Sequence, residues 1–187
     1  VTVQGFTNNN YTLTIMADPT SGLRPVIAPV ANSTAAFQIM NTSVSITGID
    51  IAPTNAMTYG IAASSAYITI SSVNVQDATG RISLAGVSLS SWSSVNYSSV
   101  TVLAAHGYLL TGSIFSSISN SSVQVTGTSI YSLYLINATS SSLSDLYITN
   151  TNGYGSWFDA NSANNTLAYS TVTISRSSAL AMLISGA

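Results

Sequence analysis

The residues of this chain with the clearest chemical signal are asparagines in the pattern Asn-x-Ser/Thr, the acceptor sequence for N-linked glycans. Seven asparagines lie in this pattern: Asn10, Asn32, Asn41, Asn96, Asn120, Asn137 and Asn164. A chain rich in Asn, Ser and Thr produces such patterns by chance, so their number alone is a weak indication. We expect N-glycosylation because sugars would also keep a nearly uncharged surface in solution, and glycosylation indicates an extracellular or cell-surface protein.

The acidic residues are too few and too scattered to predict an active site. Enzymes that hydrolyse polysaccharides need two or three carboxylates close together as acid and base. Measured against the repeat described below, the aspartates do not fall at one position of adjacent repeats: Asp18, Asp50, Asp77, Asp145 and Asp159. Asp77 and Arg81 lie close enough in sequence to predict a salt bridge within a turn.

His106 is the single histidine, and because Gly107 follows it we expect it in a solvated turn. The chain has no Cys or Glu to complete a metal site with it. Serine is abundant, but no Asp and His lie in register with one to activate it as a nucleophile. We therefore expect no enzymatic activity, no metal and no cofactor.

Aromatic residues are a second candidate for binding, because exposed rings can stack on sugars. Trp157 and Phe158 are expected to fill the interior, and Tyr97 and Tyr169 are expected in a core column. Four tyrosines late in the chain predict an external strip, for which subunit contact and sugar recognition are the alternatives: Tyr131, Tyr134, Tyr147 and Tyr154.

A repeat of about 24 residues must position these side chains. An apolar-polar-apolar fragment recurs as 49–51, 73–75, 100–102, 123–125, 146–148 and 172–174. A second such fragment precedes most of these by five residues, and a third apolar patch opens most units. Three short strands per unit, repeated six times, indicate a stacked architecture rather than chance.

If each unit forms one coil, equivalent positions stack about 4.8 Å apart through parallel hydrogen bonds. Since side chains alternate between the two faces of a strand, one inward column is predicted: Ile49, Val73, Val100, Val123, Leu146 and Val172. The residues between the paired apolar positions predict an outward ladder: Asp50, Asn74, Thr101, Gln124, Tyr147 and Thr173.

The repeat also places some of the sequons. Asn41, Asn137 and Asn164 lie 10 or 11 residues before the last residue of their repeats, so we expect them in one shared turn region. Asn96 lies between Val95 and Tyr97, which are both predicted to point inward, and is therefore expected to face solvent.

Segments such as 59–61 and 67–75 resemble the loose coil repeat of the pectate-lyase-like family. In its composition, the chain also resembles prokaryotic or archaeal cell-surface β-helix glycoproteins. The resemblance covers residues 35–187 and implies an all-β, right-handed parallel β-helix of about six to seven coils. Many members of this family degrade polysaccharides, so it also implies carbohydrate binding or degradation as an alternative function. The competing fold is an antiparallel β-sandwich or jelly roll, whose hairpins should contain turn dipeptides such as Asn152-Gly153, the single example here.

Residues 1–34 keep a poorer period and predict an irregular first coil that caps the solenoid, because Pro25 and Pro29 exclude a central strand between them. At the other end, the apolar segment 179–184 lacks a polar cap. We therefore expect either that more chain follows residue 187 or that another subunit covers this end, as in a homo-oligomer or filament.

Composition excludes several classes of protein. The 187 residues include 46% hydrophobic but 4% charged residues, with 35 serines, three arginines and no lysine. Nucleic-acid binding is excluded because it needs clustered positive charge, and no stretch is long enough to predict a membrane span. The expected function is structural: a β-helical module of an extracellular filament, sheath, S-layer or adhesin, with a viral receptor-binding fibre as a further alternative.

Overall fold

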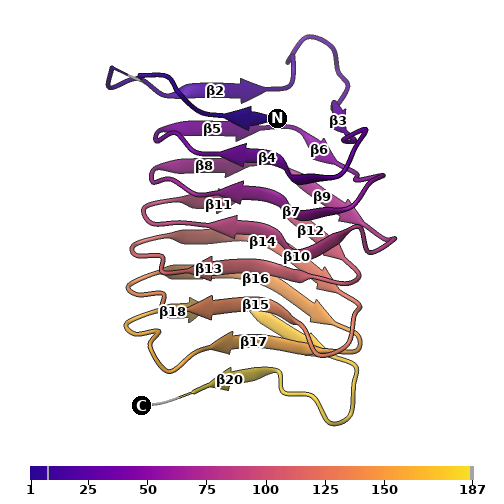
Figure 1. The fold of residues 1–187 in the computed structure, drawn as a ribbon. Helices are drawn as coiled ribbons and strands as arrows, with labels where there is room; N and C mark the ends of the chain where they lie inside the picture. The colour runs from indigo at the N-terminus through magenta and orange to yellow at the C-terminus, as the bar shows by residue number, and fades with distance from the viewer. Residues whose placement is uncertain (8, 186–187) are drawn as a thin grey trace.

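The computed structural model of the chain describes residues 1–7 and 9–185, which form twenty β-strands and no helix. The strands wind into a solenoid of about seven turns with about 24 residues per turn. Figure 1 shows these coils stacked one upon another, with the N-terminus at one end and the C-terminus at the other. Because the described residues contain no helix, none of them forms a helix that could cross a membrane.

Sheet A receives one strand from each coil and runs the length of the solenoid. Its eight strands are β1 (Thr2–Val3), β4 (Ser33–Ile39), β7 (Met57–Ala63), β10 (Ile82–Leu89), β13 (His106–Thr111), β15 (Tyr131–Ile136), β17 (Tyr154–Phe158) and β20 (Met182–Ile184).

Sheet B lies on the other side of each coil and bends in the middle, so that most coils contribute two short strands to it. Its first half contains β2 (Leu13–Met16), β5 (Val44–Thr47), β8 (Ile68–Ser71), β11 (Ser94–Asn96) and β18 (Thr166–Ala168). Its second half contains β3 (Val26–Ile27), β6 (Asp50–Ile51), β9 (Asn74–Asp77), β12 (Ser99–Val102) and β19 (Thr171–Ile174). Two longer strands run through both halves, β14 (Ser117–Val125) and β16 (Ser142–Asn150).

All pairings between these strands are parallel. Parallel neighbours need a long connection between them, and here each connection is the other side of the same coil. The predicted parallel β-helix is confirmed, and the antiparallel sandwich, which would join sequential strands by hairpins, is excluded.

The first coil ends just before β4, at residue 32, two residues earlier than predicted, and has long segments between its strands. β1, β2 and β3 pair with β4, β5 and β6 of the next coil. β3 lies between Pro25 and Pro29 at the outer edge of sheet B, where a missing backbone N–H is tolerated. At the other end the solenoid continues to β20, and residues 186–187 lie outside the described residues.

Columns of apolar side chains fill the interior, but their register differs from the predicted one. Val75, rather than Val73, pairs with Val100, which in turn pairs with Val123. Val73 instead faces Ser98, whose Oγ accepts the Val73 N–H at 3.1 Å. The predicted column is therefore wrong by two residues at this step, and again at Leu146, because Val123 and Val172 both pair with Ile148. A shift of two keeps each side chain on its own face, so the alternation in the sequence is the same in both registers.

The outward ladder shifts in the same way, because Asn74 pairs with Ser99 and not with Thr101. The ladder that contains Thr101 instead joins it to Gln76 above and Gln124 below. The predicted ladder is also wrong at Tyr147, because Gln124 and Thr173 both pair with Thr149.

Each complete coil has two bends at which one residue, usually not glycine, adopts a left-handed conformation. Bend 1 leads from sheet A into sheet B, and its left-handed residues have φ between 53° and 59°: Ser43, Tyr67, Trp92, Phe115, Ser140 and Asn164. Bend 2 divides sheet B and contains Gly48, Ser72, Tyr97, Asn120, Asp145 and Tyr169. The stacking of successive coils brings the members of each set into one column.

The bends explain why the predicted core positions of two tyrosines are wrong. Simple alternation puts Tyr97 and Tyr169 in the core, but the left-handed backbone interrupts the alternation and turns both side chains outward. They are 65% and 89% exposed. Trp157 also differs from the prediction, since it lies half-buried on the outer face of sheet A, whereas Phe158 is buried as predicted.

A buried serine follows the left-handed residue at several bends and replaces the interrupted backbone pairing. The Ser121 hydroxyl accepts the Ser98 N–H of the neighbouring coil at 3.1 Å and donates to the Ser119 carbonyl at 2.7 Å. Ser98 and Ser93 make equivalent pairs of bonds. Since buried backbone groups need a partner, these serines are structural, and the interior tolerates them because both sides of the hydroxyl are bonded.

Sheets A and B approach each other most closely along a column of small residues in sheet A. This column contains Ala36, Gly60, Gly86, Gly107, Ser132 and Gly155. A Cβ added at any of its four glycines would lie within 3.0 Å of a valine on sheet B, namely Val75, Val100, Val123 or Val172 respectively. Each of these valines therefore packs directly on the backbone of the facing strand.

Candidate functional site

The sequon asparagines lie on the outside of the solenoid or at its bends. Five of the seven have exposed side chains: Asn10, Asn32, Asn120, Asn137 and Asn164. Asn41 and Asn96 are half-buried. None of them lies in the apolar interior, so attached sugars would not have to displace the core.

Three of the asparagines lie in connections from sheet A to sheet B, in the shared turn region that the repeat predicts. Asn41 follows β4, Asn137 follows β15, and Asn164 occupies the left-handed position of bend 1. Asn137 also has a positive φ, of 51°. Asparagine adopts this conformation more readily than most residues. The backbone conformation therefore favours asparagine at positions 137 and 164 whether or not they are glycosylated.

The two half-buried asparagines are constrained by their surroundings. The Nδ2 of Asn41, the atom that would carry a sugar, donates a hydrogen bond to the Phe6 carbonyl at 2.5 Å. Asn96 was expected to face solvent between two inward side chains, but its Oδ1 is buried and has no hydrogen-bond partner among the described residues. Both side chains are less accessible than those of the exposed sequons.

Asn120 lies in a groove that follows bend 2 along the outer face of sheet B. The groove has a volume of about 490 Å³, and its lining includes Tyr97, Tyr147, Asn120, Asp145, Asn74 and Ser99. Both tyrosines are exposed, and the remaining side chains are hydroxyls, amides and one carboxylate. This lining matches a neutral, hydroxyl-rich ligand better than a charged one.

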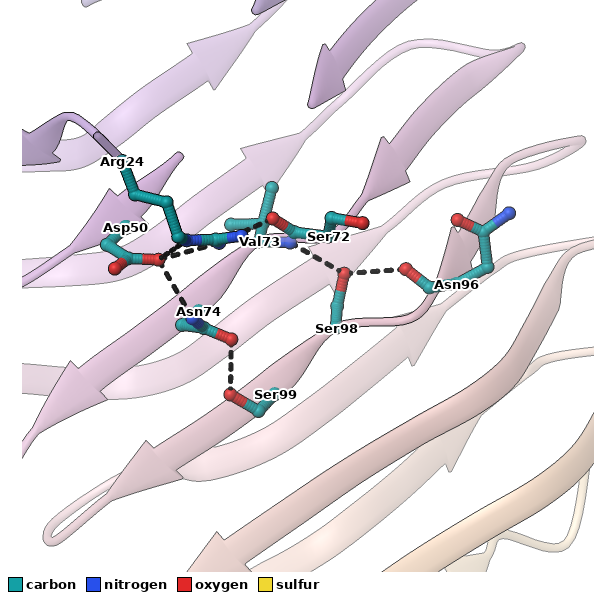
Figure 2. A network of polar contacts seen from close by, with 8 residues as sticks. All are labelled: Arg24, Asp50, Ser72, Val73, Asn74, Asn96, Ser98 and Ser99. Atoms are coloured by element: carbon teal, nitrogen blue, oxygen red, sulfur yellow. Dashed lines mark hydrogen bonds and ion pairs between the residues drawn. The ribbon is translucent and has the colours of Figure 1, made fainter. Parts of the chain in front are cut away.

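A polar network continues from this groove toward the N-terminal coil (Figure 2). Arg24 forms an ion pair with Asp50, at 2.7 Å between Nη2 and Oδ1, and donates to the Ser72 carbonyl at 2.6 Å. Asn74 Nδ2 donates to the same carboxylate at 2.8 Å, and Ser99 Oγ donates to Asn74 Oδ1 at 2.7 Å. The network joins the first coil to the three that follow it, and the Oδ1 of its carboxylate accepts hydrogen bonds from both Arg24 and Asn74.

Two other aspartates, Asp77 and Asp159, are held by hydrogen bonds within their own turns or from a neighbouring coil. Asp77 is buried and accepts the backbone N–H groups of Arg81 and Ile82 at 2.9 and 2.7 Å. The predicted Asp77–Arg81 salt bridge is wrong, because among the described residues the ion pair is that of Arg24 with Asp50. The carboxylate caps the turn through the backbone instead.

Asp159 caps a turn in a similar way, beside the Asn137 sequon. Its Oδ1 accepts the Asn137 N–H at 3.0 Å and the Ser162 hydroxyl at 2.7 Å. Burial raises the pKa of Asp159, but these hydrogen bonds outweigh it and leave the pKa below its usual value. Within the described ranges, no three His, Cys, Asp or Glu side chains are grouped closely enough to hold a metal ion.

His106 lies in strand β13 rather than in a solvated turn, and it belongs to a cluster of rings on the outer face of sheet A. Its Nδ1 accepts the Tyr131 N–H at 3.0 Å, and burial lowers its pKa from 6.5. Tyr131, Tyr134, Tyr154 and Trp157 complete the cluster, with ring centroids 4.7 to 5.7 Å apart between contacting pairs. Tyr147 was expected in this strip but lies on sheet B.

Sequence reasoning missed a second set of rings, at bend 1. Tyr67, Trp92 and Phe115 occupy the same position in three successive coils, with centroids 6.1 Å and 4.5 Å apart. All three are exposed, by 57%, 46% and 53%. The signal was present in the sequence, because each aromatic residue lies one or two positions before the strand that enters sheet B.

Comparisons of the chain with protein-family models, with curated proteins and with solved structures found no match.

Proposed function

We propose that this chain is a structural module of an extracellular surface glycoprotein, of the kind that builds a filament, a sheath, an S-layer or an adhesin. The observation that carries the proposal is the exposure of five sequon asparagines on a nearly uncharged solenoid. Sugars attached at these positions would project outward and would leave the core columns intact.

The architecture suits a passive, load-resisting role. Parallel hydrogen bonds join every described coil to the next in both sheets, so the backbone is satisfied along the whole length. The surface is dominated by Ser, Thr and Asn, and the net charge is −2. Neutral hydroxyls and sugars would then provide the hydration that charged residues provide on most proteins.

The test of glycosylation is the mass of the native protein before and after deglycosylation, with occupancy determined for each sequon. We expect sugars at Asn10, Asn32, Asn120, Asn137 and Asn164, and little at Asn41 and Asn96 because their side chains are half-buried. An unchanged mass would overturn the glycoprotein proposal.

End-to-end association is the second part of this proposal. The N-terminal coil presents β1, β2 and β3, and the C-terminal coil presents β20, β18 and β19, which belong to the same three ladders. A cleft at the C-terminal end is lined by apolar residues, among them Leu167, Met182 and Ile184, and by polar residues that include Asn164. A sugar on Asn164 must therefore leave the cleft along bend 1 for two copies to meet at this end. Light scattering on a dilution series tests this part: we expect oligomers that dissociate on dilution, and monomers at all concentrations would contradict it.

Binding of an external carbohydrate is a second candidate function, favoured by the groove at bend 2. Two exposed tyrosines and several hydroxyl and amide side chains line this groove. We would expect neutral glycans to bind on an array and the double substitution Tyr97→Ala, Tyr147→Ala to abolish the signal. Because Asn120 lies inside the groove, a sugar on Asn120 would occupy the site itself, and occupied Asn120 would count against this second function.

A further inference from the structure

The three rings at bend 1 are held in an unfavourable backbone conformation. Tyr67, Trp92 and Phe115 have φ of 59°, 58° and 53°. A left-handed conformation is unfavourable for a residue with a side chain, and for a bulky residue it is a true outlier. The same position holds serine in two other coils and asparagine in a third. Three bulky residues at such a position indicate a role other than stability.

The rings form a continuous stack with an open face at its lower end. Trp92 covers one face of Phe115, at a centroid distance of 4.5 Å and an interplanar angle of 32°. The next residue in the column is the small Ser140, and Phe115 is 53% exposed. The lower face of Phe115 is therefore accessible to a flat, partly apolar group.

Asn164 follows Ser140 in the same column, two coils below Phe115. The Thr139 bridges to Ile114 and Ala163 fix this alignment. Two coil spacings correspond to about 10 Å. Because Asn164 shares the left-handed conformation of Phe115, with φ of 57°, its side chain leaves the backbone in a similar direction, alongside the rings.

The chemistry of a pyranose fits this space. Such a sugar often has one face made up of C–H groups, and these carry partial positive charge that is attracted to the negative face of an aromatic ring. Its hydroxyls would meet the hydroxyl and amide groups of the neighbouring bends. No charged residue belongs to this column, so the surface favours a neutral ligand.

We propose that the N-glycan on Asn164 folds along bend 1 and packs on the ring of Phe115. This inference rests on the glycosylation assigned above. The other sequons fit less well, because Asn41 is half-buried and Asn120 lies at the other bend, while Asn137 lies three residues before Ser140 and outside the column.

The test is a double-mutant cycle that leaves the bend conformation intact. Thr166→Val removes the sequon but keeps Asn164 and the shape of a β-branched residue in β18. Phe115→Ser introduces the residue found at Ser43 and Ser140 in the same column. Tyr169→Ser is the matched control, because Tyr169 is an exposed left-handed tyrosine at bend 2.

We expect loss of the Asn164 glycan to lower the midpoint of denaturation in the parent and in the Tyr169→Ser protein. In the Phe115→Ser protein the same loss should have no effect. Sugar protons should also show upfield ring-current shifts in the NMR spectrum of the parent, and these should be absent from Phe115→Ser. The same cycle in protein from a non-glycosylating host should show no coupling.

The possible failures are distinguishable. Occupied Asn164 with equal effects in both backgrounds and no ring-current shift would overturn the inference and leave the glycoprotein proposal standing. A bare Asn164 beside other occupied sequons would do the same. Ring-current shifts that depend on protein concentration would mean that the sugar comes from a second copy, which also overturns it. Absence of sugar from every sequon would overturn both proposals.

Discussion

At the scale of single residues, the buried serines at the bends show how this solenoid turns corners without losing hydrogen bonds. A left-handed residue rotates its peptide group out of the ladder, and the hydroxyl that follows restores the missing partner. Ser121, for example, bonds to the backbone of two coils at once. The abundance of serine is therefore partly structural and not simply a replacement for surface charge.

Replacing Ser121 by Ala should lower the free energy of unfolding by about 1–3 kcal/mol, because the Ser98 N–H would remain buried without a partner. Ser117→Ala in the same strand is the control, since Ser117 points outward and belongs to no sequon, and the change should stay within about 0.5 kcal/mol. Chemical denaturation of the two variants measures both values. Equal effects would mean that the hydroxyl of Ser121 is not needed inside the bend.

A second prediction at this scale concerns pH. Burial lowers the pKa of His106 below 6.5, and protonation of its Nδ1 would also break the bond from Tyr131. The unfolded chain therefore binds a proton at a higher pH than the folded chain, and stability falls as the pH decreases below about 6.5. The fall ends near the lower pKa of the folded state.

Denaturation at a series of pH values between about 7 and 5 tests this assignment. The His106→Phe variant keeps a ring in the cluster and should lose the pH dependence. Asp18 and Asp159 do not interfere, because their lowered pKa values place their titration at more acidic pH. A slope that persists in His106→Phe would show that another group titrates in this range.

At the scale of strands and bends, the close approach of the two sheets depends on the glycine column of sheet A. Gly86→Ala would force a Cβ against Val100, and over-packing of this kind costs about 1–3 kcal/mol. Val100→Ala alone should cost about 2 kcal/mol through lost packing. The double variant should lose less unfolding free energy than the sum of the two single variants, by about 1 kcal/mol or more. The reason is that the smaller alanine at position 100 makes room for the methyl group added at position 86.

Thr101→Ala is the control for this cycle, since Thr101 lies next to Val100 but faces outward. Its effect should add to that of Gly86→Ala without coupling. Additive effects for Gly86 and Val100 as well would contradict direct packing of the valine on the facing backbone.

The repeat period and the parallel architecture were predictable from the sequence, because Val100 and Val123 and their counterparts alternate with polar residues at a constant spacing. The register was less predictable, since Val73 and Val75 point to the same face and a slip of two residues changes nothing in the pattern. The positions of Tyr97 and Tyr169 could not be predicted from alternation, because both residues are themselves in the left-handed conformation that interrupts it. Trp157 and Phe158 are adjacent in β17, so strict alternation allows only one of them to point inward.

The candidate site was predictable to a similar extent. The spacing of Asn41, Asn137 and Asn164 indicated one edge of the solenoid, and they lie in that region. The stack of Tyr67, Trp92 and Phe115 was missed because aromatic residues are unusual at positive φ. The capping role of Asp77 was also missed, because its partners are backbone groups of the following turn, which no side-chain pattern reveals.

At the scale of the whole molecule, the near absence of charge separates this solenoid from most proteins of its size. With three arginines and five aspartates, and the Arg24–Asp50 pair as the ion pair among the described residues, stability should depend little on electrostatics. The thermal midpoint should stay nearly constant between about 0.01 M and 0.15 M salt, over which the screening length falls from roughly 30 Å to 8 Å. Arg24→Ala should remove any small residual dependence, and a large salt effect in that variant would contradict the prediction.

The packing of a glycine in sheet A against a valine in sheet B, which recurs in four coils, has a consequence for how such a chain can evolve. A coil contacts its immediate neighbours and little else, so duplication or loss of a complete repeat creates an interface of a kind that already exists. Each event would lengthen or shorten the molecule by about 4.8 Å. Related genes would then differ by whole multiples of the period, and partial insertions would be confined to the loops.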